Sequence, residues 1–160
     1  LVGAAGTGGT ALAASPSRSP NQIFFVAARV EDPTAGVFAL GAINGIGTLT
    51  AESADFHQES DSFVETDRVV VGGGTLHVTV HGRFSAWPFT LDPVTCTRWG
   101  GLTGTWTLDS GEGPFAGATG SGTFGGHFFT YAAHMPGGCD ESAIKGFSVG
   151  PLIGTVNLPG

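Results

Sequence analysis

FVETDRVVVGGGTLHVTVHGRF, at residues 63–84, contains two runs rich in β-branched residues with three glycines between them. Such residues favour strands, and consecutive glycines favour a tight turn. In the second run, Leu76, Val78 and Val80 alternate with polar or small residues, which is the two-residue period of a strand with one apolar face. This stretch therefore predicts two neighbouring strands joined by a glycine turn.

The same succession of β-rich runs and turn clusters continues along most of the chain. The predicted strands cover residues 23–30, 37–43 with 47–51, 63–71, 75–84, 86–96, 102–108, 120–132 and 144–158. Residues 37–51 form either a strand pair around Asn44 or one bent strand. No segment keeps apolar residues at helical spacing over three turns, so no helix is expected.

Many short strands with glycine-rich turns indicate a sandwich or a barrel. Barrels need small residues where strands bend sharply, and glycine is abundant throughout this chain, with 28 residues. We therefore predict an all-β fold, an antiparallel β-barrel of about eight strands.

Length and charge limit the classes of partner. A chain of 160 residues can form one domain with a buried core. Its formal net charge is −7, and its six basic residues are scattered. Nucleic acid needs clustered lysine and arginine, so nucleic acid and anionic lipid are excluded as partners. No apolar run is long enough to span a bilayer as a helix, and no membrane partner is expected.

The first residues, LVGAAGTGGTALAAS at 1–15, are small and apolar. They end in an A-x-A cleavage pattern at 11–13, and a polar Pro/Ser segment follows. We predict a leader over residues 1–20, made of a signal-peptide remnant and a linker, and a barrel domain over residues 21–160. A flexible leader without a targeting role is the alternative.

Cys96 and Cys139 are the two cysteines of the chain. Such a pair forms either two buried thiols or one disulfide. Their neighbours are polar and typical of loops, which favours a disulfide. A disulfide implies an oxidising compartment, so we predict a secreted, extracellular protein.

Residues 104–124, GTWTLDSGEGPFAGATGSGTF, form the most distinctive segment. The pattern G-x-G-x-F-x-x-A-x-G falls on Gly111, Gly113, Phe115, Ala118 and Gly120. Together with the run GGTLHVTVHG at residues 73–82, this segment resembles the allene oxide cyclase and dirigent proteins. We expect positive φ at the first two of these glycines, and we expect the phenylalanine to plug one barrel end.

The resemblance implies an eight-stranded antiparallel barrel whose interior shapes a small substrate. Allene oxide cyclases isomerise a fatty-acid epoxide, and dirigent proteins steer the radical coupling of phenols. The acidic and asparagine motif of the cyclases has no clear counterpart in residues 21–50, and the paired aspartates of the dirigent pocket cannot be placed. The resemblance therefore extends to the architecture and not to catalytic residues.

His77 and His81 are the candidate catalytic residues. They share one face of the predicted strand 75–84, opposite the valines. If this face lines the lumen, an imidazole can exchange a proton with an oxygenated hydrophobic substrate. If it points outward, both histidines lie on the surface, and alternation favours this outcome because valines usually lie inside. The two are about 13 Å apart along a strand, so no metal site and no cofactor are predicted.

Phe84, Phe89 and Phe128 are the candidate ligand-binding aromatic residues. They either line an apolar pocket or fill a closed core. Arg83 is either a carboxylate-binding residue at the barrel mouth or an ordinary surface residue.

Acidic residues are frequent between residues 52 and 67. They are Glu52, Asp55, Glu59, Asp61, Glu65 and Asp67. Their spacing fits no known calcium loop, and protection of a strand edge by charge is the favoured interpretation.

Two classes of function remain. The first is a secreted barrel that binds a small hydrophobic, oxygenated molecule, either as a binder or as a non-covalent cyclase or isomerase that shapes its substrate. The alternative is a non-enzymatic extracellular structural or self-assembling protein whose N-terminal segment adds as a strand to a neighbour in a homo-oligomer. A cavity of a few hundred Å³ favours the first function, and a solid core favours the second.

Overall fold

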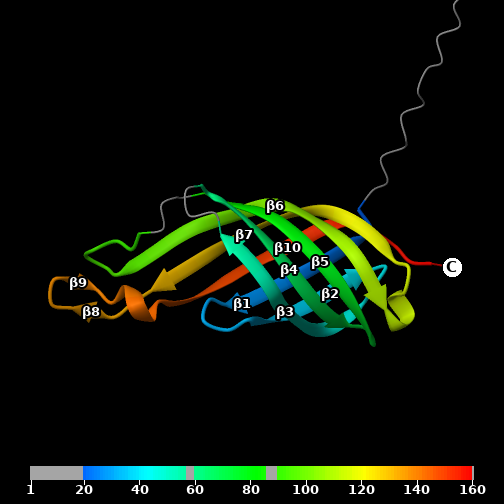
Figure 1. Cartoon of the computed structure of the whole chain (residues 1–160), viewed down its shortest axis with the longest axis horizontal. Helices are drawn as coiled ribbons and strands as arrows, with labels where there is room; N and C mark the ends of the chain where they lie inside the picture. The colour runs from blue at the N-terminus through cyan, green and yellow to red at the C-terminus, as the bar shows by residue number, and fades with distance from the viewer. Residues whose placement is uncertain (1–19, 57–59, 86–89, 160) are drawn as a thin grey trace, which may run out of the picture.

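The computed structural model describes residues 20–56, 60–85 and 90–159, which form mostly β-strands (Figure 1). Eight strands close into an antiparallel barrel, which confirms the predicted fold class. They are β1 (Gln22–Arg29), β2 (Thr34–Gly41), β3 (Gly45–Phe56), β4 (Ser62–Val71), β5 (Gly74–Phe84), β6 (Thr97–Glu112), β7 (Thr119–Tyr131) and β10 (Lys145–Asn157). Residues 1–19 of the predicted leader lie outside the described residues.

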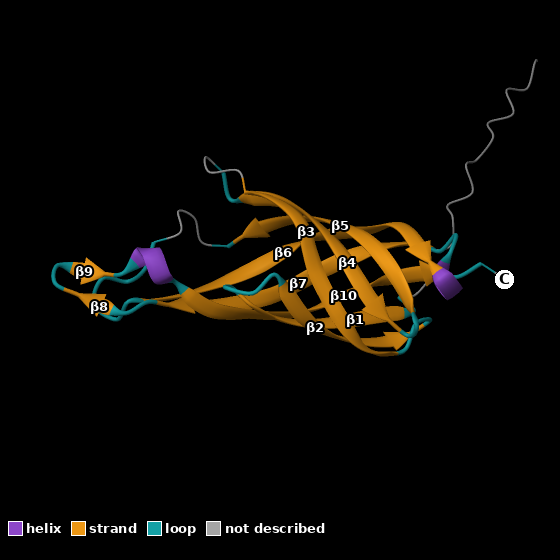
Figure 2. Ribbon diagram, turned by 60° about the horizontal axis from the view of Figure 1, so that its bottom comes forward, coloured by secondary structure: helices purple, strands orange, loops and turns teal. Residues whose placement is uncertain are grey.

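Each barrel strand from β1 to β7 pairs with the next one along the chain. β10 then pairs with both β7 and β1, and this closes the barrel (Figure 2). A closed barrel has no free strand edge. The interpretation of the acidic residues as protection of a strand edge is therefore wrong.

Short elements lie at the two ends of the barrel. The 3-10 turn η1 (Gly113–Phe115) joins β6 to β7 at one end. The hairpin of β8 (His134–Met135) and β9 (Gly138–Cys139) projects from the opposite end, and the 3-10 turn η2 (Glu141–Ala143) follows it (Figure 1). The described residues contain no α-helix, and hence no helix that is long and apolar enough to cross a membrane.

The strand predicted over residues 86–96 is wrong for its described part. Residues 90–96 form a loop with a turn at residues 93–95. The Asp92 carboxylate accepts hydrogen bonds from the backbone N–H groups of Val94 and Thr95, at 2.9 and 2.8 Å, and this turn competes with strand pairing. Residues 86–89 lie outside the described residues.

Inward and outward residues alternate along β5 as the sequence pattern predicts. Leu76, Val78 and Val80 are buried inside the barrel. The polar residues that alternate with them, which include both histidines, lie on the outer wall. This alternation fixes the register of β5 with its neighbours, because a one-residue slip would expose every apolar side chain.

The half of the barrel next to η1 is filled with side chains, and we call it the packed half. Its centre is Trp106, whose ring meets that of Phe24 edge to face at 5.9 Å. Phe115 of η1 is buried in the same core cluster and fills the end of the barrel, as predicted.

Gly111 and Gly113, at the connection from β6 to η1, are glycines for different structural reasons. Gly113 has a φ of +63°, in the left-handed region that was predicted for it. The same prediction is wrong for Gly111, which lies in β6 without a positive φ. A Cβ atom at Gly111 would come within 2.1 Å of the carbonyl oxygen of Phe115, so close packing excludes a side chain there.

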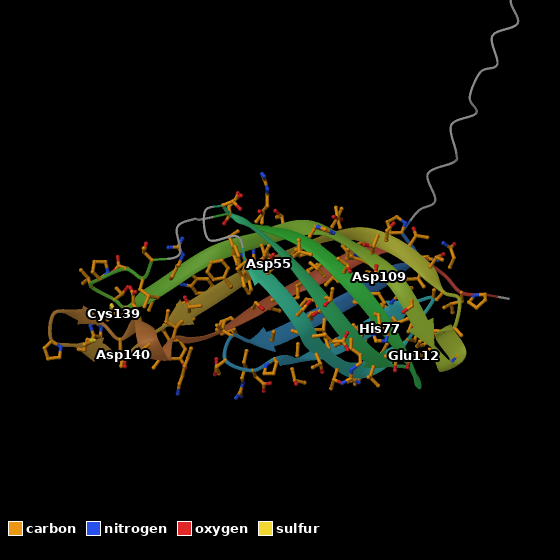
Figure 3. All side chains as sticks on the ribbon, in the orientation of Figure 1. Asp55, His77, Asp109, Glu112, Cys139 and Asp140 are labelled. Atoms are coloured by element: carbon orange, nitrogen blue, oxygen red, sulfur yellow. A yellow bond between two sulfur atoms is a disulfide. The ribbon has the colours of Figure 1, made fainter. Side chains whose placement is uncertain are left out.

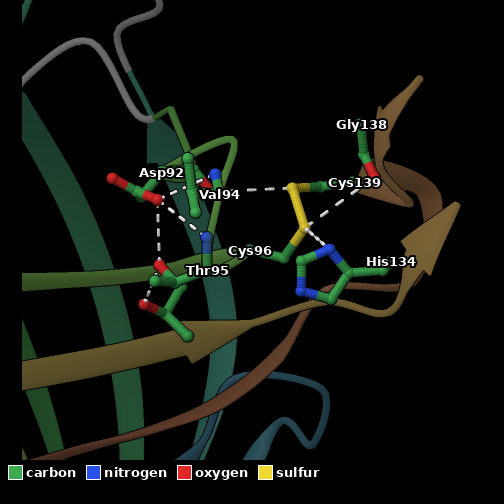
Figure 4. The surroundings of a disulfide bond; sticks show 8 residues. Asp92, Val94, Thr95, Cys96, His134, Gly138 and Cys139 are labelled. Carbon is green, nitrogen blue, oxygen red and sulfur yellow. Dashed lines mark hydrogen bonds between the residues drawn. A yellow bond between two sulfur atoms is a disulfide. The ribbon is translucent and has the colours of Figure 1, made fainter.

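The predicted disulfide is confirmed. Cys96 and Cys139 are bonded across 43 residues of sequence, with their Cα atoms 5.5 Å apart. The bond ties the loop before β6 to the β8–β9 hairpin (Figure 4). The ring of His134 lies next to it, with its Nδ1 atom 3.4 Å from the sulfur of Cys96.

Candidate functional site

The half of the barrel at the β1–β2 turn is hollow, and we call it the hollow half. It encloses a space of about 700 Å³, the mouth cavity, whose wall includes residues 28–33. Small side chains on inward positions, such as Ala28, Ala35 and Ser148, leave this space unfilled. The volume lies in the range of small-molecule sites, and the described wall is mainly apolar.

Aromatic rings line one side of the mouth cavity. Phe84 lies at the centre of this group, with its ring centroid 5.0 Å from that of Phe63, 5.8 Å from that of Phe128 and 6.2 Å from that of Phe56. These contacts hold the rings in fixed positions through offset and edge-to-face packing. Phe84 and Phe128 therefore line an apolar space in this half of the barrel.

A smaller space of about 170 Å³, the inner chamber, lies deeper in the barrel. Ala35, Leu49 and Glu65 line both spaces, so the two are neighbours. Asp67 lines the inner chamber and also the narrow gap of about 20 Å³ beside Trp106 in the packed half. The inner chamber is thus the transition from the hollow half to the packed half.

Two carboxyl groups face the inner chamber. Glu65 and Asp67 are on β4, where alternation places both on the inward face. Asp67 is only 4% exposed, and its Oδ1 atom has no hydrogen-bond partner among the described residues. A buried oxygen without a partner is costly, and natural proteins retain few of them. This oxygen therefore marks a position where a ligand donor fits.

Burial and mutual repulsion raise the pKa values of the pair. Burial, followed by the negative charge of Glu65, raises the pKa of Asp67 to about 8. Burial also raises the pKa of Glu65, and the hydrogen bond with Asp67 opposes this rise. The same hydrogen bond raises the pKa of Asp67, so the two groups share a proton. At neutral pH the pair holds one proton and one negative charge.

Among the described residues, no basic side chain compensates the negative charge of the pair. The interactions that set the two pKa values involve Glu65, Asp67 and Glu52 and no arginine, lysine or histidine of the described residues. No three His, Cys, Asp or Glu side chains of this described part converge as metal ligands.

Comparisons with protein-family models, with curated proteins and with solved structures find no match. The cavity and its carboxyl pair are therefore the basis for inferring what the protein does.

The structure corrects the hypothesis of catalytic histidines in the lumen. His77 and His81 lie on the outer wall of β5, because Leu76, Val78 and Val80 occupy its inward face. The ring of His77 lies between two carboxylates, 3.5 Å from Glu52 and 3.3 Å from Glu112. Figure 3 shows His77 beside Glu112 near η1, at the end of the barrel opposite the mouth cavity.

Arg83 also lies on the outer wall. Its side chain is 72% exposed, and its Nε atom is 3.7 Å from the carboxylate of Asp61. Arg83 does not line the mouth cavity, so its interpretation as a ligand-binding residue loses its basis. Phe89, the third predicted aromatic residue, lies outside the described residues.

Glu65 and Asp67 are not among the predicted site residues, because in the sequence they lie within the acidic stretch of residues 52–67. The signal that finds them is strand parity. Both are an even number of positions from Phe63 and Val69, which are buried on the inward face of β4. Once the inward positions of β4 are assigned in this way, two carboxyl groups at inward positions of an otherwise apolar strand become candidates for function.

Proposed function

We propose that this barrel binds a small, mainly apolar molecule in the mouth cavity, with the polar group of the molecule against Glu65 and Asp67. The observation that carries the proposal is the unpartnered, buried Oδ1 atom of Asp67 at the inner end of an apolar space. Apolar walls with a few converging polar groups are typical of ligand sites. The volume of about 700 Å³ supports binding over a purely structural role.

The carboxyl pair also supports cyclase or isomerase chemistry. A pair that holds one proton can donate it at one atom of the ligand while its carboxylate accepts a proton from another atom. No net proton is consumed in such an exchange. The fixed aromatic wall around Phe84 would hold the ligand in one shape during the reaction. A role as binder and a role as isomerase therefore use the same site.

The experiment is binding of the neutral apolar dye Nile red, followed by its fluorescence. Two matched variants, Ala28→Phe and Ala27→Phe, place the same ring on neighbouring residues of β1. Ala28 lines both spaces, whereas Ala27 is exposed on the outer wall. We expect Ala28→Phe to weaken dye binding at least tenfold and Ala27→Phe to leave it unchanged.

Circular dichroism and thermal melting of both variants show whether each remains folded. Equal dye affinity in the wild type and in a folded Ala28→Phe variant would place the dye outside the cavity. That result, or an absence of dye binding to the wild type, would overturn the proposal.

An extracellular location is part of the proposal. The disulfide supports it, because such bonds persist in oxidising compartments. A relationship to the allene oxide cyclase and dirigent proteins also remains a proposal. Its support is the residue patterns at 73–82 and 104–124, together with the eight-stranded closed barrel that the resemblance implies.

A homo-oligomer is the second candidate, with a structural role for the outer wall. Phe25, Phe38 and Leu40 are each exposed by 44% or more on the outer wall of β1 and β2. Exposed apolar groups of this size are typical of association surfaces. The N-terminal segment expected to act as an added strand lies outside the described residues. Light scattering on a sizing column measures the molar mass, and a monomeric mass would exclude this candidate.

A further inference from the structure

The charge around the cavity limits the kind of ligand that it accepts. Glu65 and Asp67 are the two ionisable residues in the described wall of the inner chamber. At neutral pH they place one negative charge beside the apolar space, and no basic residue contributes to their pKa values. The pair therefore has no counter-ion among the residues that the structure describes.

The rim of the mouth cavity adds further negative charge. Arg29, Glu31 and Asp32 line it, so two carboxylates accompany one guanidinium. Hydrogen bonds from its own backbone N–H and from that of Gly146 lower the pKa of Glu31, which keeps this group ionised. A negatively charged ligand would meet repulsion at the rim and again at the inner chamber.

We propose that the molecule bound in the mouth cavity carries an amino group, and that its ammonium form binds the carboxyls of Glu65 and Asp67. This proposal rests on the proposed function and names the chemical class of the ligand, an amine on an apolar body. An ammonium group offers three N–H donors and no acceptor. It can therefore serve the free Oδ1 atom of Asp67 and the Glu65 carboxylate together.

A neutral alcohol and a carboxylic acid fit the same site less well. An alcohol offers one donor and no charge, so it leaves the negative charge of the pair without a counter-ion. A carboxylate would bring a further negative charge into a space that is already acidic. The order of affinity for one apolar body is therefore amine, then alcohol, then carboxylate.

Binding of an ammonium also displaces the shared proton. A positive charge beside Asp67 favours its ionised form and lowers its pKa from about 8. The negative charge of Glu52 on β3 also acts on the pair and raises the pKa of Asp67, so it opposes part of this change, although Glu52 lies on the outer wall beside Arg68 and His77. The inward side chains of β5 are apolar and carry no charge. Proton release thus accompanies amine binding near pH 7, and affinity rises with pH toward 8.

The experiment is titration calorimetry of the full chain with decylamine, decanol and decanoate, each below its aggregation concentration at pH 7.5. We expect decylamine to bind at least tenfold more tightly than decanol, and decanoate to bind most weakly. Repeating the decylamine titration in buffers of different ionisation enthalpy counts the protons released, and we expect a release of part of one proton per ligand.

Glu65→Gln and Asp67→Asn keep the shape of each side chain and remove its charge. We expect either change to reduce the tenfold preference for decylamine over decanol to threefold or less, mainly through a loss of affinity for decylamine. Asp109→Asn is the matched control, because Asp109 lies on the outer wall of β6, where it accepts a hydrogen bond from Thr79. We expect it to keep the full preference.

The outcomes separate the two proposals. Equal affinity of the wild type for decanol and decylamine, or a preference for decanoate, would overturn the amine proposal and leave the cavity as a ligand site. The same holds for a preference that survives in folded Glu65→Gln and Asp67→Asn variants. An absence of binding by Nile red and by all three decyl compounds would overturn the proposed function and the amine proposal together.

Discussion

Asp67 lies two residues after Glu65 on β4, and both carboxyls face the inner chamber of the barrel. Their closeness makes each group dependent on the other, because two negative charges in a buried space repel. The pair is therefore a single unit that titrates in two steps. The raised pKa of Asp67 therefore makes the stability of the protein depend on pH.

The stability of the protein should fall as the pH rises from about 4 to about 8. Asp67 keeps its proton up to a pH of about 8 in the folded state and loses it near 3.8 in the unfolded state. Over this window the folded state binds more protons, so the free energy of unfolding decreases by at most about 1.4 kcal/mol per pH unit. Above pH 8 this contribution is lost.

Urea unfolding of the wild type and Asp67→Asn at pH 5, 6, 7 and 8 measures this effect. The variant should show a flatter dependence on pH, while the exposed control Asp109→Asn should follow the wild type. Parallel curves for the wild type and Asp67→Asn would contradict the raised pKa.

Removing the disulfide should lower stability without changing the fold. Cys96 and Cys139 close a loop of 43 residues, so the chain-entropy model gives a loss of about 4 kcal/mol for the double serine variant. Urea unfolding measures the loss, and far-ultraviolet circular dichroism checks that the barrel persists. Wild type in reductant should match the variant, and equal stability with and without reductant would show that the bond contributes nothing.

The two glycines at the β6–β7 connection should respond differently to alanine. Gly111→Ala should cost more stability, because its methyl group would overlap the carbonyl oxygen of Phe115. Gly113→Ala meets no atom within 3.5 Å, so only its φ of +63° opposes it, at about 1–2 kcal/mol.

Two variants separate the causes. Gly113→Asn should recover part of the loss, since asparagine tolerates the left-handed region, whereas Gly111→Asn should not. Glu112→Ala, on the exposed residue between them, is the control. Melting temperatures that are equal for both alanine variants would contradict the distinction.

The outer histidines should be dispensable for ligand binding. His77→Ala and His81→Ala remove side chains from the outer wall of β5 and leave the described cavity wall intact. Nile red fluorescence should therefore give wild-type affinity for both variants. A tenfold loss in either variant would mean that the histidine acts on the cavity through the wall, contrary to its position.

Local pattern was enough to predict that this chain forms a β-barrel. The alternation of Leu76, Val78 and Val80 is a property of a single strand, and a closed sheet is one of the few ways to bury one face of many such strands. The disulfide could also be predicted locally, because the polar, loop-like neighbours of Cys96 and Cys139 favour a disulfide over two buried thiols. The turn residues around Phe115 and Gly113 were enough to predict that Phe115 closes one end of the barrel and that Gly113 has a positive φ.

The candidate ligand site depends on the pairing of strands that are distant in sequence. The sequence places Glu65 and Asp67 among other acids, and only the pairing of β4 with β3 and β5 puts their carboxyls inside a closed wall. The hollow half is also a product of several strands, since Ala28, Ala35 and Ser148 come from β1, β2 and β10. Whether a lumen is filled depends on side chains that face one another across the barrel, and these are distant in sequence. Burial, which raises the pKa of Asp67, exists only after that closure.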